Sequence, residues 1–243
     1  TGKPLHLGGS LGRTEATSRG LQFVLREYLK TTKKDIKKMT VAVQGFGNVG
    51  SNAAKFLHED GGKVVAVSDV HGGIRNPKGL DIPKLLEYYA KNKKLDGFPG
   101  AESYDNKAPL FEDVDILVPA ALDCVINMDN VEKVKAKIII EGANGPITFN
   151  AHQVLAKKGV DMIPDNLANS GGVTVSYFEW VQNRMQFYWT EEEVNKRLED
   201  YMKKAFKEVW DMKTKLDTTI RTGAYALALQ KVGDCTKSRG LYA

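Results

Sequence analysis

The chain has little of what a metal site or a disulfide framework requires. Its 243 residues include only two cysteines, Cys124 and Cys235, and four scattered histidines, and the cysteines lie outside any metal-ligand spacing. Isolated cysteines of this kind are typical of reduced thiols in cytoplasmic proteins. We therefore expect a cytoplasmic protein without a bound metal.

Long apolar runs are also missing. No apolar stretch approaches the roughly 18–20 residues that a membrane span needs, so no membrane partner is expected. The sequence has no signal-peptide pattern and opens with Thr1 instead of Met, so we expect that an upstream part of the protein is missing.

The net charge of +5 arises largely from two lysine clusters, at 30–38 and 91–94. A basic cluster can contact nucleic acid, but these lysines are not interleaved with aromatic residues and no nucleic-acid motif accompanies them. We expect solvated surface at both clusters and no nucleic-acid partner.

Predicted strands and helices alternate through the first two thirds of the chain. Short apolar runs predict strands at 40–44, 63–68, 115–119, 137–141 and 161–164. Helices are predicted at 17–29, 48–59, 82–92 and 148–158, with Asp81 as the N-cap of the third. Because helix-length segments between strands imply right-handed crossovers, we expect an α/β fold with a doubly wound, mostly parallel, Rossmann-like sheet.

Beyond Pro164 the alternation stops, and nearly continuous helix is predicted. The expected helices are an aromatic-rich segment at 173–189, an amphipathic helix at 191–213 and a last helix at 218–232. Thr190 and Glu193 form a capping-box pattern at the start of the second. The simplest organisation is one dinucleotide-binding domain, residues 1–243, with a leading helix region (1–30), a Rossmann core (39–165) and additional C-terminal helices (173–243).

The most informative motif follows the first predicted strand, where the chain reads Gly45-Phe-Gly47-Asn-Val-Gly50. In a dinucleotide-binding turn, the first glycine permits the tight turn, the second lets backbone approach the pyrophosphate, and the third lets the next helix pack closely. The helix from Asn48 then offers free N–H groups to phosphates. Asp69 ends the second strand about 20 residues further on, where a carboxylate accepts ribose hydroxyls. A glycine-rich turn without a ligand is the alternative, and it leaves Asp69 unexplained.

Small and amide side chains follow the later predicted strands. Ligands of open α/β sheets lie beyond the carboxyl ends of the strands, and these ends carry Ala120, Ala121, Asn144 and Asn169. Small residues leave room for a flat ring, and an asparagine suits an amide or ribose hydroxyls. The alternative is that both asparagines only form turns, because asparagine tolerates left-handed backbone. Spacing alone does not separate the two.

Four stretches together carry a family resemblance. They are LGGSLGRTEAT at 7–17, GFGNVG at 45–50, EGANGP at 141–146 and NSGGVTVSYFEW at 169–180. The chain resembles glutamate dehydrogenases, within the glutamate/leucine/phenylalanine/valine dehydrogenase family. The resemblance covers only the carboxyl-terminal, cofactor-binding half of such an enzyme. The family's amino-terminal substrate domain, with its substrate-holding lysines and proton-transferring aspartate, has no counterpart in the sequence.

The resemblance implies roles for individual residues. Cofactor-binding residues are implied at Thr17, Gly45, Phe46, Gly47, Asn48, Val49, Gly50, Asp69, Ala120, Ala121, Asn144 and Asn169. Substrate-binding residues are implied at Arg13, Asn169, Val173 and Ser176, with Arg13 on the α-carboxylate and Ser176 on the γ-carboxylate. No catalytic residue is implied within this chain. The alternatives are a surface ion pair for Arg13 and a helix N-cap for Thr17.

The implied reaction is the reversible oxidative deamination of L-glutamate to 2-oxoglutarate and ammonia. NAD is the expected cofactor because Asp69 should repel a 2′-phosphate, but NADP stays open because His71, Arg75 and Lys78 follow closely and can neutralise one. The chain alone is expected to be inactive, and the full-length enzyme to form a homohexamer. Two alternatives stay open: a dehydrogenase of another amino acid, and a non-catalytic nucleotide-binding or assembly module.

The chain departs from the family pattern at three positions. Ser18 stands where many members have glycine, Ser170 replaces a common alanine, and Asp123 replaces a frequent glutamate. Because each replacement is small or like-for-like, we expect the cofactor geometry to be nearly unchanged.

Overall fold

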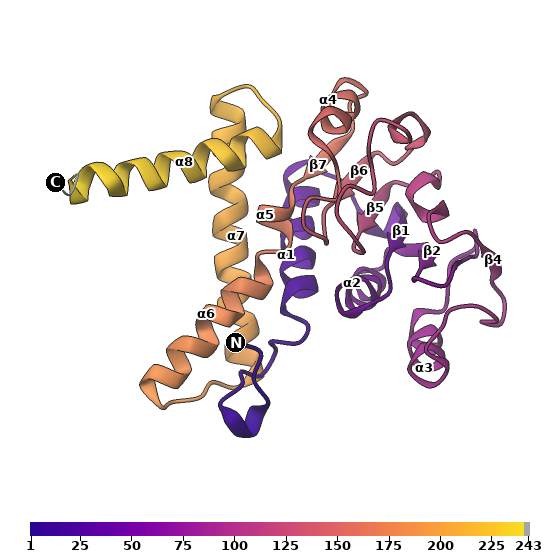
Figure 1. Cartoon of the computed structure of the whole chain (residues 1–243), viewed down its shortest axis with the longest axis horizontal. Coiled ribbons are helices and arrows are strands. Elements are labelled where there is room, and N and C mark those ends of the chain that lie inside the picture. The colour runs from indigo at the N-terminus through magenta and orange to yellow at the C-terminus, as the bar shows by residue number, and fades with distance from the viewer. Residues whose placement is uncertain (241–243) are drawn as a thin grey trace.

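A computed structural model describes residues 1–240, and its centre is a seven-stranded sheet in the order β4-β3-β2-β1-β5-β6-β7 (Figure 1). The strands are β1 (Thr40–Gln44), β2 (Lys63–Ser68), β3 (Gly73–Arg75), β4 (Glu102–Tyr104), β5 (Ile116–Pro119), β6 (Ile138–Ile140) and β7 (Asp161–Ile163). The β2-β1-β5-β6-β7 part is parallel, and β3 and β4 add an antiparallel edge beside β2. The predicted α/β fold with a mostly parallel sheet is confirmed.

Helices cover both faces of the parallel part. They are α1 (Ala16–Thr31), α2 (Asn48–Glu59), α3 (Ile82–Asn92), α4 (Phe149–Lys157), α5 (Asp165–Ala168), α6 (Gly171–Met185), α7 (Glu191–Lys215) and α8 (Ile220–Arg239). Successive side chains of a strand point to opposite faces. Val41 and Val43 accordingly join one core cluster with α1, α2 and α3, whereas Ala42 joins a second cluster with α4. Burial on both faces explains why these strands are continuous apolar runs in the sequence.

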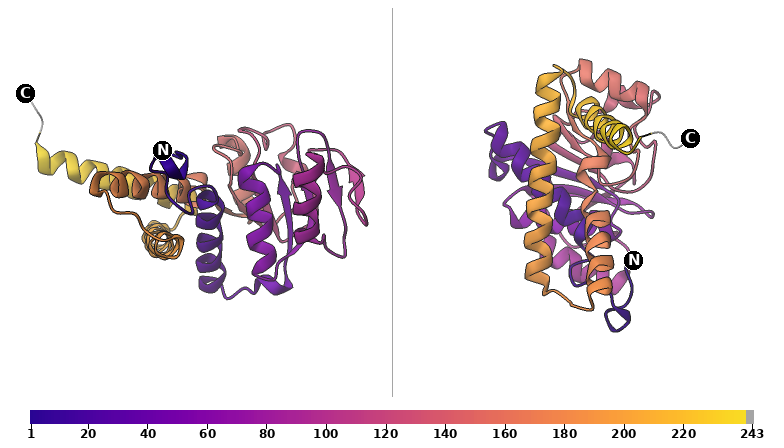
Figure 2. Two further views of the ribbon diagram at one scale, coloured as in Figure 1. Left: turned by 90° about the horizontal axis from the view of Figure 1, so that it is seen from below. Right: turned by 90° about the vertical axis from the view of Figure 1, so that its left-hand side faces the viewer.

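The last helices form a layer beyond α1 (Figure 2). The buried stripe Val194, Leu198, Met202 and Phe206 places α7 in the same core cluster as α1. α8 begins near β7 and then projects away from the body of the molecule (Figures 1 and 2). The start of α8 is therefore close to the sheet, whereas its end is not.

The start of α6 crosses the start of α1 at a distance that only glycine permits. A Cβ on Gly171 would lie 2.3 Å from the Ala16 carbonyl oxygen, and a Cβ on Gly20 would lie 2.8 Å from the Gly171 Cα. A Cβ on Gly172 would lie 2.4 Å from the Thr17 hydroxyl. This close crossing brings the first turn of α6 against the first turn of α1.

The switch point of the sheet lies between β1 and β5. The chain leaves β1 toward β2 and later crosses back to place β5 on the other side of β1. Loops that leave neighbouring strands in opposite directions open a crevice at the carboxyl ends of those strands. The turn after β1 and the loop after β5 flank this crevice.

Most predicted elements are present, and the differences have local causes. The helix predicted at 173–189 ends at Met185, because Gln186 takes a φ of +54° and closes α6. The last helix continues beyond its predicted end to Arg239. β3 and β4 were not predicted, since three-residue strands are too short to display an alternating pattern. α1 begins at Ala16 with Glu15 at the N-cap position, so Thr17 is not the helix cap.

Two predicted helix caps are confirmed by hydrogen bonds. The Asp81 carboxylate accepts the Lys84 backbone N–H at 3.2 Å, and Thr190 and Glu193 form a reciprocal capping box at the start of α7. Within residues 1–240, no helix has both the length and the apolar character needed to cross a membrane.

Candidate functional site

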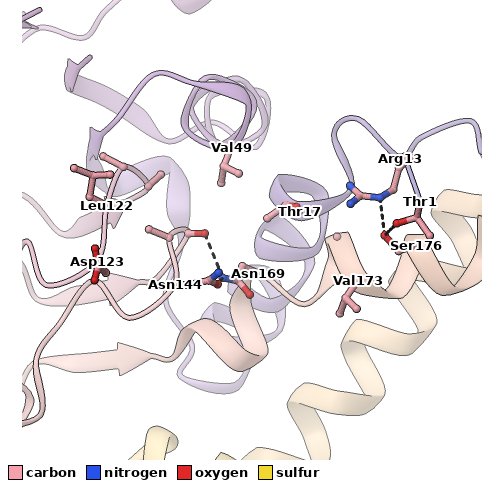
Figure 3. A pocket seen from close by; sticks show the side chains of 15 residues that line it. Thr1, Arg13, Thr17, Val49, Leu122, Asp123, Asn144, Asn169, Val173 and Ser176 are labelled. Atoms are coloured by element: carbon pink, nitrogen blue, oxygen red, sulfur yellow. Dashed lines mark hydrogen bonds between the residues drawn. The ribbon is translucent and has the colours of Figure 1, made fainter. Parts of the chain in front are cut away.

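A cleft of about 960 Å³ opens beyond the carboxyl ends of β5 and β6, against the first turns of α1 and α6 (Figure 3). It is lined by Thr1, Arg13, Thr17, Val49, Ala120, Ala121, Leu122, Asp123, Gly142, Ala143, Asn144, Asn169, Gly172, Val173 and Ser176. The structure thus brings together nine predicted site residues: Arg13, Thr17, Val49, Ala120, Ala121, Asn144, Asn169, Val173 and Ser176. The remaining predicted residues, Gly45, Phe46, Gly47, Asn48, Gly50 and Asp69, lie outside this lining.

Three glycines shape the turn between β1 and α2. Gly45 has a φ of +95°, and a Cβ there would lie 2.8 Å from the Ala120 carbonyl group, so the position requires glycine. A Cβ on Gly50 would lie 1.8 Å from the Gly45 oxygen. Gly47 differs, because its φ is −73° and a Cβ there would meet nothing within 4 Å. The open space over Gly47 lies beside the free N–H groups of the first turn of α2, which suits a phosphate.

Neighbouring side chains hold this turn in place. Phe46 is buried and packs edge-on against Tyr89 of α3, with ring centroids 5.1 Å apart. Asn48 Nδ2 donates to the Thr14 carbonyl oxygen at 2.7 Å. The amide nitrogen of a residue that was predicted to face the cofactor is therefore hydrogen-bonded within the protein. Ser18, which stands where many family members have glycine, also contacts the turn, because its hydroxyl donates to the Val49 carbonyl oxygen at 2.7 Å.

Asp69 follows β2 and is only 9% exposed. Its Oδ1 accepts the backbone N–H groups of His71 and Gly72, at 2.8 and 3.1 Å, which fixes the carboxylate. Its Oδ2 is buried and has no hydrogen-bond partner in the described part of the chain, and the same is true of Gln44 Oε1 and Ser68 Oγ. Because buried polar atoms in proteins are rarely left without a partner, this edge of the sheet suits a ligand that brings donors, such as a ribose diol.

Two of the basic residues that follow Asp69 do not approach its carboxylate. Arg75 forms ion pairs with Glu102 and Glu112, each at 3.4 Å. Lys78 lies in a groove with the first residues of β2, at the opposite end of that strand from Asp69. Of the three basic residues, His71 adjoins the carboxylate, and the hydrogen bond that it forms is through its backbone N–H.

Asn144 and Asn169 form a hydrogen-bonded pair in the cleft (Figure 3). Asn169 Nδ2 donates to Asn144 Oδ1 at 2.6 Å and also approaches the Gly142 carbonyl oxygen at 3.4 Å. Neither asparagine has a positive φ, so a left-handed turn is not the reason for either residue. The pair links the loop after β6 to the segment after α5.

Arg13 and Ser176 meet at the α6 side of the cleft (Figure 3). Arg13 Nε donates to Ser176 Oγ at 2.9 Å, and the Thr1 hydroxyl donates to the same oxygen at 2.8 Å. Within residues 1–240, Arg13 has no carboxylate within ion-pair distance, so a surface ion pair does not explain it. Val173, one turn earlier on α6, is 68% exposed and lines the same cleft.

A buried charged cluster lies behind the asparagine pair, and sequence reasoning missed it. Glu141 is fully buried after β6 and pairs with Arg221 of α8, while its Oε2 accepts the Asp165 N–H at 3.0 Å. Burial raises the pKa of Glu141 to about 7, although the Arg221 charge acts in the opposite direction. Burial also lowers the pKa of His152 to about 4, and the Arg221 charge adds to this. One feature of the sequence could have indicated this cluster, namely a glutamate directly after three isoleucines of a buried strand.

The chemistry of these groups fits a dinucleotide. The glycine turn offers N–H groups and open space, Asp69 offers a buried acceptor without a partner, and the cleft offers an amide pair and a cation. Phosphates, a ribose diol, a carboxamide and a carboxylate are the matching ligand groups. Among residues 1–240, no group of three or more His, Cys, Asp or Glu side chains is arranged to hold a metal ion.

Known proteins resemble this chain over its full length. The sequence profile described as Glutamate/Leucine/Phenylalanine/Valine dehydrogenase matches residues 8–240. A glutamate dehydrogenase from Thermotoga maritima is 49% identical over 243 residues, which are 100% of this chain and 58% of that protein. Among solved structures, the hetero-hexameric glutamate dehydrogenase from Thermus thermophilus in a leucine-bound form matches with a TM-score of 0.93 at 34% identity, and that from Peptoniphilus asaccharolyticus with 0.85 at 38%. Each structural match covers 100% of this chain and 57% of the other.

Proposed function

Because the chain belongs to the glutamate/leucine/phenylalanine/valine dehydrogenase family, we propose that it is the dinucleotide-binding part of a glutamate dehydrogenase. The whole enzyme would catalyse the reversible oxidative deamination of L-glutamate to 2-oxoglutarate and ammonia. The observation that carries this proposal is that one cleft contains both the Arg13–Ser176 pair and the Asn144–Asn169 pair, next to the glycine turn.

The proposed cofactor is NAD, whose nicotinamide supplies the hydride acceptor when it is bound. The N–H groups of the first turn of α2 would hold its pyrophosphate over Gly47, and Asp69 Oδ2 would accept a ribose hydroxyl. A 2′-phosphate beside Asp69 would be repelled, because like charges at short range destabilise each other. Since Arg75 is held by two glutamates and Lys78 lies at the other end of β2, neither is placed to offset that repulsion.

The proposed substrate contact is a carboxylate held by Arg13 and Ser176 together. Ser176 Oγ already accepts two hydrogen bonds, so its O–H is left to donate. Arg13 keeps its terminal N–H groups for a charge-assisted contact with the same carboxylate. Because the two side chains touch, we propose that Arg13 supports the contact of Ser176 with the γ-carboxylate of glutamate. The α-carboxylate contact that the resemblance implies for Arg13 stays a prediction.

The same pair favours glutamate over apolar amino acids. A site built to hydrogen-bond a substrate group rejects substrates that lack the group, because its own polar atoms are then left unpaired. Leucine, valine and phenylalanine have no side-chain carboxylate for Arg13 and Ser176. Val173 beside them is proposed to contact the methylene groups of the substrate.

The chain spans 58% of the length of its Thermotoga maritima relative. We propose that the lysines that hold the substrate and the aspartate that transfers the proton lie in a part of the protein that corresponds to the rest of such relatives. The 243-residue chain alone would then bind dinucleotide without appreciable turnover.

A homohexamer is proposed for the full-length enzyme. The Thermus thermophilus relative, which is a hetero-hexamer, supports the number of six subunits. A cytoplasmic location is proposed because Cys124 and Cys235 are free and exposed thiols.

Amino-acid-dependent reduction of the nicotinamide, followed by its absorbance in a full-length enzyme that contains this chain, tests the proposal. We expect kcat/KM for glutamate to exceed that for leucine, valine or phenylalanine by at least about 100-fold, the scale that a hydrogen-bonded specificity group provides. Comparable values for leucine would favour a dehydrogenase of another amino acid. Dinucleotide binding without turnover of any amino acid would favour a non-catalytic binding module.

A further inference from the structure

Arg221 connects α8 to the sheet from a mostly buried position. It is the second residue of α8, and its side chain is only 15% exposed. Its guanidinium contacts the fully buried Glu141 through Nη2 and lies 3.8 Å from Asp165 Oδ1 through Nη1. One planar group therefore bridges two carboxylates that follow two different strands, β6 and β7.

Each of these carboxylates holds the backbone of a loop that lines the cleft. Glu141 Oε2 accepts the Asp165 N–H at 3.0 Å, and Asp165 Oδ2 accepts the Gly145 N–H at 2.8 Å. Gly145 directly follows Asn144, and the Asp165 carbonyl oxygen accepts the Asn169 N–H at 2.9 Å. Both members of the asparagine pair are thus one hydrogen-bonded step away from the partners of Arg221.

In the described part of the chain, Arg221 is the cation paired with Glu141. A carboxylate that is wholly buried needs such a partner, because removal of one member of a buried ion pair leaves an uncompensated charge. His152 does not serve this purpose, since burial lowers its pKa to about 4 and leaves it neutral at pH 7. Loss of Arg221 would remove the one guanidinium that fixes the Glu141 and Asp165 side chains relative to each other. Without it, Glu141 can become neutral by taking up a proton, and the two side chains and the loops that they hold lose that bridge.

We propose that Arg221 is a positioning residue for the Asn144–Asn169 pair, and through that pair for the nicotinamide end of the cofactor. This inference rests on the proposed function, because it assumes that the pair contacts the nicotinamide carboxamide, which ADP-ribose lacks. Arg221 itself is not among the residues that line the cleft, so it acts through Glu141 and Asp165.

The two ends of the dinucleotide should respond differently to a change at Arg221. The glycine turn after β1 and Asp69 after β2 form none of the contacts of Arg221, so the pyrophosphate and adenosine side of the site should be unaffected. ADP-ribose contains that side and lacks the nicotinamide. A positioning role therefore predicts weaker binding of NADH with unchanged binding of ADP-ribose, whereas a general loss of structure would weaken both.

The test is calorimetric titration of the full 243-residue chain with NADH and with ADP-ribose. We expect Arg221→Gln to weaken NADH by about tenfold, the size of one lost hydrogen bond, and to leave ADP-ribose unchanged. Arg221→Lys keeps the charge but loses the planar fork that spans two carboxylates, so it should weaken NADH selectively but less, and it decides the question if Arg221→Gln does not fold. Lys231→Gln is the matched control, because it breaks the ion pair to Glu208 further along α8 and should change neither affinity.

Three outcomes separate the possibilities. Selective loss of NADH affinity in the Arg221 variants supports the inference. Unchanged NADH affinity, or a parallel loss of NADH and ADP-ribose, overturns it while the proposed function stands. A wild-type chain that binds neither ligand overturns the proposed function, and this inference with it.

Discussion

Arg13 and Ser176 are 163 residues apart in the sequence, and in the fold Arg13 Nε donates a hydrogen bond to Ser176 Oγ at 2.9 Å. The contact depends on the glycines that let α6 cross α1 closely, since Arg13 precedes α1 and Ser176 lies on α6. With Thr1 also donating to Ser176, the hydroxyl has one direction left, as a donor. The two side chains therefore form a single anion site.

Replacement of Ser176 by alanine should raise the KM for glutamate by about 10- to 100-fold, since one hydrogen bond to a charged group contributes roughly 1.5–3 kcal/mol. The measurement is steady-state kinetics of a full-length enzyme that contains this chain. Ser238→Ala, which removes an exposed hydroxyl near the end of α8, is the matched control and should leave KM unchanged. An unaltered KM in the Ser176 variant would exclude its contact with the γ-carboxylate.

Alanine at two of the glycines should separate binding from stability. Gly47→Ala places a Cβ in the open space of the turn at a permitted φ, so the free energy of unfolding should change by no more than about 1 kcal/mol. NADH affinity should fall at least about tenfold, because that space is where backbone approaches the pyrophosphate. Gly50→Ala would clash with the Gly45 oxygen and should destabilise the fold by about 2–3 kcal/mol. Urea unfolding and NADH titration of both variants check this, and full NADH affinity in Gly47→Ala would contradict the proposed pyrophosphate position.

His152 should make the fold less stable in acid. Burial lowers its folded-state pKa to about 4, so the unfolded chain binds the proton first as the pH falls below the ordinary histidine value. At a pH above the ordinary histidine pKa, His152 is neutral in both the folded and the unfolded chain, so it does not make the free energy of unfolding depend on pH. As the pH falls from that value toward 4, the stability that the neutral histidine contributes is lost. Between pH 7 and pH 5, wild type should lose about 2 kcal/mol more unfolding free energy than His152→Leu.

Urea unfolding at the two pH values gives that difference directly. Glu141 is present in both proteins, so its own titration largely cancels in the comparison. His6→Asn, which removes an exposed imidazole from the start of the chain, is the matched control. Equal losses for wild type and His152→Leu would mean that the histidine is not held neutral by its surroundings.

The sequence predicts the parts of the site that are encoded locally. The glycine turn is one contiguous strand–turn–helix segment, and its spacing to Asp69 follows from the length of one helix and one strand, so both are readable without a structure. Asn144 and Asn169 were placed by the rule that strand ends meet at one edge of a parallel sheet. Their mutual hydrogen bond was not predicted, because it depends on the conformations of two loops.

Contacts between distant segments were not predictable in this way. Nothing near Arg75 in the sequence indicates that Glu102 and Glu112 engage it, since that depends on the antiparallel edge formed by β3 and β4. The sequence likewise predicts only that Arg221 lies in a helix. Its ion pair with Glu141 was not predicted, because Glu141 follows β6, 80 residues earlier in the chain. In both cases the tertiary fold decides what a charged side chain contacts, and so what it can do for a ligand.

The most direct test of the central claim is a side-by-side titration of the chain with NADH and NADPH, on wild type and on Asp69→Ser. Asp234→Ser, which removes an equal charge from the exposed face of α8, controls for net charge. We predict saturable binding of NADH to wild type, at least about tenfold tighter than NADPH, and a loss or reversal of this preference only in Asp69→Ser. A wild-type chain that binds neither dinucleotide, or that prefers NADPH, would contradict the assignment of Asp69 and of the cleft beside it.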